Sequence, residues 1–213
     1  MTDLLTEVDR FRAWAETYPV GSRSGEWECD YEAWQPLYGA VFDFLASRPF
    51  ASWSSDETRA VLFAIARDNE MQHLAGQIRE EHPLLLLPLA RAALQLGEPD
   101  GRWQLAEELG WLGRRGGEEE TVLLVLARDE HEYVRRKALA SLARLGSPAV
   151  EEVALAAWER AVPEQQWARM MALWCLHRIA SPQLERLLRA AEADPRPHLR
   201  AYAQRVRTGE VDP

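Results

Sequence analysis

One stretch of this chain occurs twice. The segment RLGSPAVEEVALAA, from Arg144 to Ala157, returns 34 residues later as RIASPQLERLLRAA, from Arg178 to Ala191. A second echo links Asp129 with Asp194: each is followed by an aliphatic residue at the fifth position, an arginine at the sixth and an alanine at the ninth. Such self-similarity is typical of solenoids, in which each unit is too small to bury its own apolar face and stacks on its neighbours.

The spacing of apolar residues predicts helices along nearly the whole chain, with no strand or hairpin signal. Ser54 and Glu57 have the spacing of a capping box. Ser147 and Ser181 each precede a proline, which predicts an N-cap serine with proline at the first helical position. The acidic run at 118–120 predicts a solvated helix start. We expect about twelve helices in six antiparallel pairs, which makes the fold an all-α, right-handed α-solenoid.

The repeat resembles the second-helix signature of short HEAT-like repeats, the type found in phycocyanobilin lyases and many bacterial scaffold proteins. The resemblance is best over about residues 84–213, and it implies that the Asp and Arg of the signature form a structural ladder between repeats. The matching residues are Asp129, Val134, Arg135, Ala138, Leu142, Leu145 and Gly146, then Asp194, Leu199, Arg200 and Ala203, with partial matches at Arg169, Ala172, Leu176 and Ile179 and at Leu105, Leu109, Leu112 and Gly113.

Charge and composition restrict the partners. The net charge of −9 is uneven, at −11 over residues 1–120 and +2 over residues 121–213. An acidic chain repels phosphates, so nucleic acid is disfavoured. The acidic first half could attract a basic protein partner, and the alternative is that its charge only maintains solubility. The longest apolar run, residues 84–90, is too short to span a bilayer. The chain has only two cysteines, far apart, and its N-terminus does not resemble a signal peptide, so we expect a cytoplasmic protein. The ratio of 24 arginines to one lysine suggests a bacterial source.

The first 53 residues hold 11 of the 19 aromatic residues. We expect residues 1–53 to form an aromatic-rich N-terminal helical cap on a HEAT-like repeat solenoid of residues 54–213, the two making one continuous domain. The alternative is that this region is an acidic, aromatic docking surface. Its candidate partner-binding residues are Trp27, Glu28, Asp30 and Trp34.

A second candidate surface follows from the repeat register. The second helix of each pair lines the concave face of such solenoids, which is their usual binding surface. Equivalent positions on successive second helices form a strip rich in Trp and Arg, the residues that binding hot spots favour. Packing of these tryptophans in the core is the alternative. The candidate residues of the strip are Trp103, Glu107, Trp111, Arg136, Met170, Trp174 and His177.

No sequence motif specifies a reaction, a metal site or a cofactor. The leading hypothesis is therefore a non-enzymatic protein-binding module, such as an inhibitor or immunity-type protein that covers a basic partner. Two alternatives follow from the resemblance. One group of bacterial DNA glycosylases is built from HEAT-like repeats and acts on alkylated DNA, although the acidic charge opposes this function. A bilin lyase-like chaperone is the other.

Overall fold

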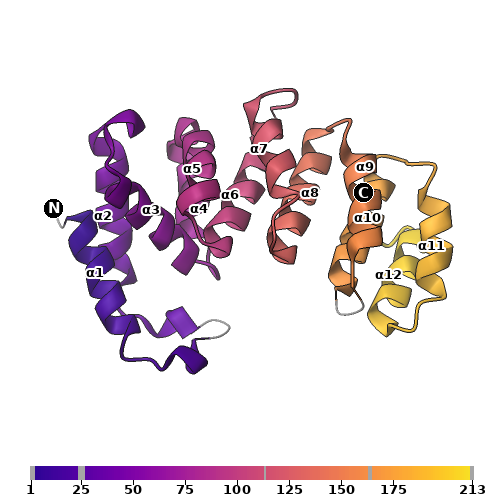
Figure 1. Cartoon of the computed structure of the whole chain (residues 1–213), viewed down its shortest axis with the longest axis horizontal. Coiled ribbons are helices and arrows are strands. Elements are labelled where there is room, and N and C mark those ends of the chain that lie inside the picture. The colour runs from indigo at the N-terminus through magenta and orange to yellow at the C-terminus, as the bar shows by residue number, and fades with distance from the viewer. Residues whose placement is uncertain (1–2, 24–26, 113, 163–164, 212–213) are drawn as a thin grey trace. The chain divides into compact units, whose positions relative to one another are not determined.

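The all-α prediction is confirmed. The computed structural model describes residues 3–23, 27–112, 114–162 and 165–211. Over these residues the chain forms twelve α-helices and three short 3-10 helices, with no strand (Figure 1). None of the described helices combines the length and the apolar character needed to cross a membrane. Gly113, which the sequence predicts at the end of a helix, lies outside the described residues.

The helices form two compact units, Met1–Glu108 and Leu109–Pro213. The boundary falls within α6, and the predicted division at residue 53 stays a prediction. The N-terminal unit contains α1 (Leu4–Ala15), η1 (Val20–Ser22), η2 (Trp27–Asp30), α2 (Trp34–Ser47), η3 (Phe50–Ser52), α3 (Ser55–Arg67), α4 (His73–Glu81), α5 (Pro83–Leu96) and most of α6 (Pro99–Trp111). The C-terminal unit contains α7 (Glu118–Leu126), α8 (Glu132–Leu145), α9 (Val150–Arg160), α10 (Gln166–Arg178), α11 (Leu184–Glu192) and α12 (Pro197–Thr208).

Helices adjacent in sequence pack against each other in the C-terminal unit. The pairs are α7 with α8, α9 with α10 and α11 with α12, and the second helices also contact one another, α8 with α10 and α10 with α12. Leucine, valine and alanine side chains fill the contacts between these helices. This stacking of helix pairs is the arrangement that the repeat predicts.

The predicted starts of three helices can be compared with the structure. The capping box of Ser54 and Glu57 is confirmed at the start of α3. The prediction that Ser147 and Ser181 are N-caps is wrong, because α9 and α11 begin three residues after them. Each serine hydroxyl instead accepts a hydrogen bond from the backbone N–H two residues later, at 3.2 Å and 3.1 Å.

These serines also connect successive repeats. The hydroxyl of Ser147 donates to Glu120 on α7, and that of Ser181 donates to Glu151 on α9. The prediction of a solvated helix start at residues 118–120 is wrong for two of the three glutamates. Glu119 and Glu120 are buried, Glu119 pairs with Arg114 at 3.2 Å, and Glu120 also accepts from the backbone N–H of Gly116.

The loops that end α8 and α10 have the same backbone conformation despite different residues. Gly146 has φ 67° and Ala180 has φ 52°. In both loops the left-handed residue and the following serine donate to carbonyls of the last helical turn, which is the Schellman pattern. Ala180 therefore adopts a conformation that ordinarily favours glycine, at a cost of roughly 1 kcal/mol. The repeat packing, rather than the local residue, determines this turn.

The predicted Asp–Arg ladder takes a more specific form. Arg135 donates to the backbone carbonyls of Asp129 and Glu130 at 2.8 Å and 2.7 Å, and Arg200 makes the equivalent bonds with residues 194 and 195. Each arginine thus closes the loop within its own repeat. The bond between repeats comes from Arg169 on α10, which pairs with Asp194 at 3.1 Å.

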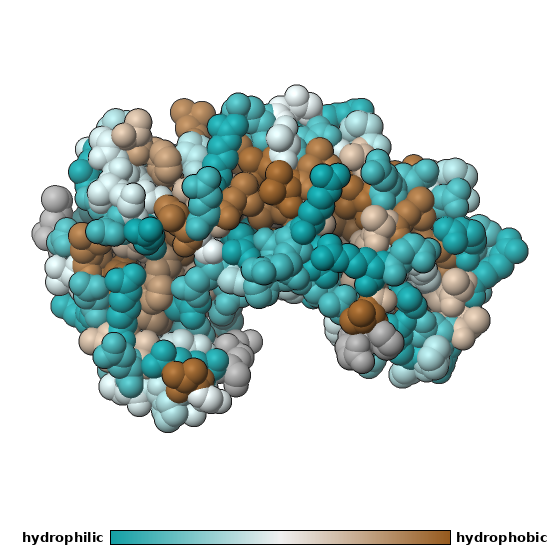
Figure 2. Space-filling model, viewed as in Figure 1, coloured by the Kyte–Doolittle hydropathy of each residue, from teal (hydrophilic) through white to brown (hydrophobic). Residues whose placement is uncertain are grey.

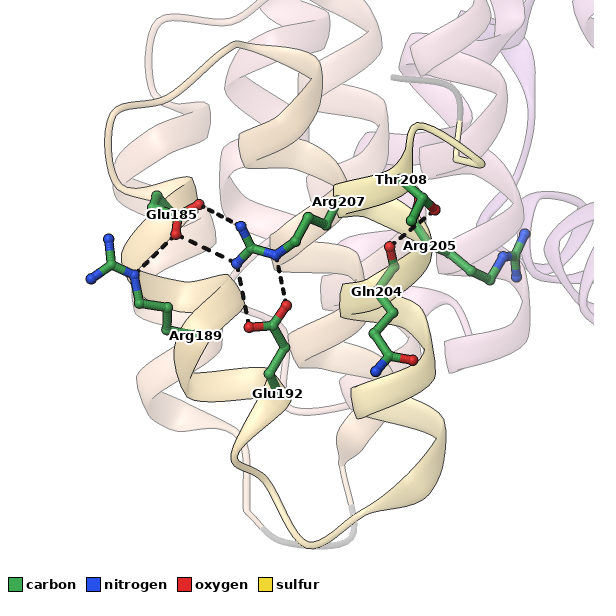
Figure 3. A network of polar contacts seen from close by, with 7 residues as sticks. All are labelled: Glu185, Arg189, Glu192, Gln204, Arg205, Arg207 and Thr208. Carbon is green, nitrogen blue, oxygen red and sulfur yellow. Dashed lines mark hydrogen bonds and ion pairs between the residues drawn. The ribbon is translucent and has the colours of Figure 1, made fainter.

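The last helix pair is also connected at its surface. Arg207 on α12 pairs with Glu185 at 3.0 Å and with Glu192 at 2.7 Å, both on α11 (Figure 3). Arg189 pairs with Glu185 from within α11. These contacts lower the pKa of Glu185, chiefly through its hydrogen bonds to the two arginines. Because the side chains are solvated, this network adds less to stability than the apolar contact beneath it.

Aromatic side chains connect the first three helices. Phe11 is buried, and its ring centroid lies 4.6 Å from that of Tyr31, 5.5 Å from that of Trp34 and 5.6 Å from that of Phe63. Phe63 belongs to α3, so the cluster extends beyond the first 53 residues. It places η2 and the start of α2 against α1, which positions the loops discussed below.

Asp194→Asn tests the bond between repeats. Hydrogen bonds to Arg196, together with the charge of Arg169, lower the pKa of Asp194 from 3.8 to about 2. Since the folded-state pKa is depressed, this stabilisation is present above about pH 4 and is lost as the pH falls towards 2. We expect the variant to lower the free energy of unfolding by about 1–2 kcal/mol at pH 7, and the difference from wild type to shrink between pH 4 and 2 in urea denaturation. The matched control is Asp56→Asn, which removes the exposed ion pair between Asp56 and Arg59. Its free energy of unfolding should change by less than about 0.5 kcal/mol. A difference that stays constant with pH would contradict this account.

Two glycine substitutions of opposite sign test the helix packing. A Cβ on Gly110 of α6 would lie 2.6–2.9 Å from atoms of Ser141 on α8, whereas a Cβ on Gly39 of α2 would meet nothing within 4 Å. We expect Gly110→Ala to destabilise the protein by about 1–3 kcal/mol through overpacking. Gly39→Ala should stabilise it by about 0.5–1 kcal/mol through helix propensity. Thermal unfolding measures both, and equal effects of the two substitutions would refute the close approach at Gly110.

Candidate functional site

A cleft of about 370 Å³ opens in the N-terminal unit beside η2, α2 and the loop from α3 to α4. Its lining combines aromatic rings with carboxylates, and we call it the acidic aromatic cleft. The lining residues are Glu28, Cys29, Trp34, Gln35, Tyr38, Arg67, Asp68, Asn69, Glu70, Met71 and His73.

Asp68 organises the loop that forms one wall of the cleft. Its side chain accepts hydrogen bonds from the hydroxyl of Tyr38 at 2.8 Å and from the backbone N–H of Leu74 at 2.7 Å. In the loop between Asp68 and Leu74, Gln72 has φ 52°, a left-handed conformation that is uncommon for a residue other than glycine. Asp68 is only 3% exposed, and burial raises its pKa and that of Tyr38. The buried carboxylate thus holds the chain from α3 to α4 in a fixed, strained turn.

Glu28 and Arg67 also line the cleft. Glu28 is buried, its Oε1 accepts from Arg67 at 3.3 Å, and its backbone carbonyl accepts from the indole N–H of Trp34 at 3.1 Å. Within the described structure its Oε2 has no hydrogen-bond partner. Burial raises the pKa of Glu28. Arg67 also pairs with Glu98 and, at 3.9 Å, with Asp100, so this guanidinium is already engaged by three carboxylates.

The cleft has an exposed edge formed by Cys29, Glu70 and Met71. The thiol of Cys29 donates to the carboxylate of Glu70, and both residues are exposed. Met71 is among the large apolar side chains most open to solvent. Cys175, in contrast, is buried, and burial raises the pKa of its thiol. Cys29 is therefore the cysteine that solvent reaches.

The arrangement suits a cationic group better than an anion. Three carboxylates line the cleft, and the one arginine among them is engaged by Glu28 and Glu98. The rings of Trp34 and Tyr38 stack at a centroid distance of 5.3 Å. Aromatic faces attract cations through the ring quadrupole, and neighbouring carboxylates add direct attraction. Across the described residues, no group of three or more His, Cys, Asp or Glu has the geometry to hold a metal ion.

The structure places the four predicted N-terminal site residues close together. Glu28 and Trp34 line the acidic aromatic cleft. Trp27 stacks on Trp14 at a centroid distance of 5.4 Å, and the exposed Asp30 accepts from the hydroxyl of Tyr18 at 3.2 Å. Of the other cleft residues, Asp68, Glu70 and Met71 lie in the loop after α3, where the sequence shows only a helix break. Tyr38 belongs to α2, and His73 begins α4. Sequence reasoning therefore missed Tyr38, Asp68, Glu70, Met71 and His73.

The predicted strip is less uniform. Trp103 is 5% exposed, and its indole N–H donates to Asp100 at 3.1 Å. It is therefore a core residue, and the prediction that it lies on an open binding surface is wrong for this position. The next candidate on α6, Glu107, is half-buried. Both lie in the N-terminal unit, whereas the remaining candidates lie in the C-terminal unit.

In the C-terminal unit, tryptophan–arginine pairs recur. Trp111 is 57% exposed, with the guanidinium of Arg144 4.4 Å from its ring centroid. The half-buried Trp174 has Arg178 at 5.5 Å. Positions 110, 140 and 143, which the repeat register also assigns to the strip, are buried, so the strip is interrupted between these pairs. Of the other candidates, Met170 and His177 are half-buried and Arg136 pairs with Glu132 at 3.0 Å.

Comparison with known families agrees with this architecture. Residues 119–206 match the family model of HEAT repeats. The chain is a HEAT-like repeat protein. The match covers the three helix pairs from α7 to α12 of this HEAT-like repeat protein, inside the range of 84–213 that the sequence predicts. No curated protein and no solved structure matches the chain.

Tyr38→Phe tests whether the bond to Asp68 holds the cleft wall. The variant keeps the ring but leaves a buried carboxylate oxygen without its hydroxyl donor, so we expect the free energy of unfolding to fall by about 1–2 kcal/mol. Tyr18→Phe is the matched control, because its hydroxyl donates to the exposed Asp30, and we expect a much smaller change in the free energy of unfolding than for Tyr38→Phe. Equal effects in chemical denaturation would show that the buried bond has no special role.

Proposed function

We propose that this HEAT-like repeat protein is a non-enzymatic binding module that docks a basic protein partner at the acidic aromatic cleft. HEAT repeats are commonly used in protein interaction, which supports the general class. The specific support is the cleft itself, which is lined by the carboxylates of Glu28, Asp68 and Glu70 and by the rings of Trp34 and Tyr38. A lysine or arginine side chain is the group that this lining suits.

Several groups of the cleft favour an incoming cation. The unpartnered Oε2 of Glu28 is a buried acceptor, and leaving such an oxygen without a donor costs free energy. Glu70 lies at the exposed edge, where a partner side chain reaches it first. Met71 adds an apolar contact for the aliphatic stem of a long basic side chain.

Charge beyond the cleft supports the same partner. Residues 1–108 carry a net charge of −10, whereas residues 109–213 carry +1. A single-sign field of this kind accelerates the encounter with a basic protein and repels phosphate backbones. These properties suit an inhibitor or immunity-type protein that covers a basic surface.

We also propose a second contact region in the C-terminal unit. It consists of the exposed Trp111 with Arg144 and of the neighbouring strip positions Arg136, Met170, Trp174 and His177.

The chain offers a direct way to identify the partner. Because Cys29 is exposed at the cleft and Cys175 is buried, a maleimide-linked photo-crosslinker labels the cleft selectively. We would crosslink the labelled protein in lysate of its own host. The control is Cys29→Ser combined with Arg205→Cys, which moves the label to the exposed surface of α12. A partner that crosslinks through a lysine- or arginine-containing segment at Cys29, and not at residue 205, would support the proposal.

Glu70→Lys tests the proposal with the purified partner. We expect the affinity to fall at least tenfold and the wild-type affinity to decrease with increasing salt, because the variant places a like charge against the incoming cation. Glu159→Lys, an exposed charge reversal on α9, is the matched control and should change the affinity less than twofold. Calorimetric titration measures both. If the affinity changes neither with salt concentration nor with Glu70→Lys, cation docking at this cleft is refuted.

A further inference from the structure

The C-terminal unit contains a pocket of the opposite character. It has a volume of about 120 Å³ and lies among the end of α7, the start of α8, the second half of α9 and the start of α10. Four arginines surround it, Arg128, Arg135, Arg136 and Arg160, and we call it the arginine pocket. Leucine, valine and alanine side chains form its floor, including Leu139. This is a concentration of positive charge in a chain whose net charge is −9.

Two of the four guanidiniums are already held by the protein. Arg135 donates to the backbone carbonyls of Asp129 and Glu130, which fixes its position at the pocket. Arg136 pairs with Glu132 and lies 4.6 Å from the ring centroid of Tyr133. These contacts give the pocket a preorganised wall, since neither arginine has to be ordered by a ligand.

The other two guanidiniums are unpaired. In the described part of the chain, the side chains of Arg128 and Arg160 form no hydrogen bond or ion pair, and both residues are exposed. Burial, followed by repulsion from Arg160, lowers the pKa of Arg135. Glu152, the remaining carboxylate of the lining, is exposed. The arginines thus exceed the carboxylates of the lining by two, and their mutual repulsion would be relieved by an anion.

We propose that the arginine pocket binds a carboxylate carried on a compact apolar body, such as an aromatic or branched-chain acid. Guanidinium groups bind carboxylates through paired, charge-assisted hydrogen bonds. The apolar floor excludes water from the body of the ligand, and the volume approaches the roughly 150 Å³ of a cavity that holds a benzene ring. The same chemistry is offered by a free small acid and by the C-terminal residue of a peptide. Because Trp34, Glu28 and Glu70 lie in the other unit, this site is independent of the acidic aromatic cleft.

Benzoate and benzamide distinguish this site from a merely apolar hollow. In calorimetric titrations at low ionic strength, benzoate should bind at least tenfold more tightly than its neutral isostere benzamide. N-acetyl-Ala-Phe with a free carboxylate, compared with the same peptide as an amide, separates the peptide source from the free acid. If the free-carboxylate peptide binds more tightly than benzoate, the site recognises a chain end; if less tightly, it recognises a small acid. No benzoate binding at about 10 mM, or equal binding of benzamide, would overturn the proposal.

Two variants locate the binding. Arg160→Gln removes an unpaired charge and should weaken benzoate binding at least tenfold, while Arg205→Gln, an exposed arginine directed away from the Arg207 network in Figure 3, should leave it unchanged. Ala156→Leu adds bulk to an exposed lining position on α9 and should abolish binding without disturbing the fold. Equal effects of Arg160→Gln and Arg205→Gln would show that benzoate responds only to overall charge, and the proposed site would be refuted.

Discussion

The structure depends on the burial of apolar helix faces between neighbours. A pair such as α9 and α10 has apolar side chains facing both the preceding and the following pair, so it is not covered until both neighbours are present. Polar bonds set the register of this stacking rather than its strength. The serines before α9 and α11 each donate to a glutamate one repeat earlier, and Arg169 reaches Asp194 one repeat later. In the view of Figure 2, hydrophilic side chains cover much of the visible surface, and hydrophobic patches interrupt them.

The sequence predicts the helices well because their signals are local. Apolar spacing and the Ser54–Glu57 capping box depend on residues within one or two turns, and α3, α5 and α12 follow these signals closely. Ser147 shows where local reasoning fails. The serine–proline pair resembles an N-cap, but the Ser147 hydroxyl donates a hydrogen bond to Glu120 of the preceding repeat, and the helix begins later. Ala180 shows the same override, since only its neighbours explain a left-handed turn at alanine.

The candidate site is harder to predict because its residues come from separate elements. Glu28 and Trp34 are recognisable in an acidic, aromatic segment, but nothing in the sequence joins them to Asp68 and Glu70. That association depends on the aromatic cluster around Phe11, which brings η2 and α2 against α3. Trp103 shows the reverse error. The repeat register places it on a binding strip, whereas its ring is buried and its indole N–H is satisfied by Asp100.

Asp68 and Glu28 connect the stability of the cleft to its use. Burial raises the pKa of both carboxyl groups, so at neutral pH each ionised group opposes folding in proportion to that shift. Asp68 offsets its cost by fixing Tyr38 and Leu74, but the Oε2 of Glu28 accepts no hydrogen bond from a described residue. A cation placed against Glu28 would favour the ionised form and lower its pKa. Unfavourable burial of this kind is typical of groups positioned for a ligand rather than for the fold, and it is the physical reason to place the partner's basic side chain here.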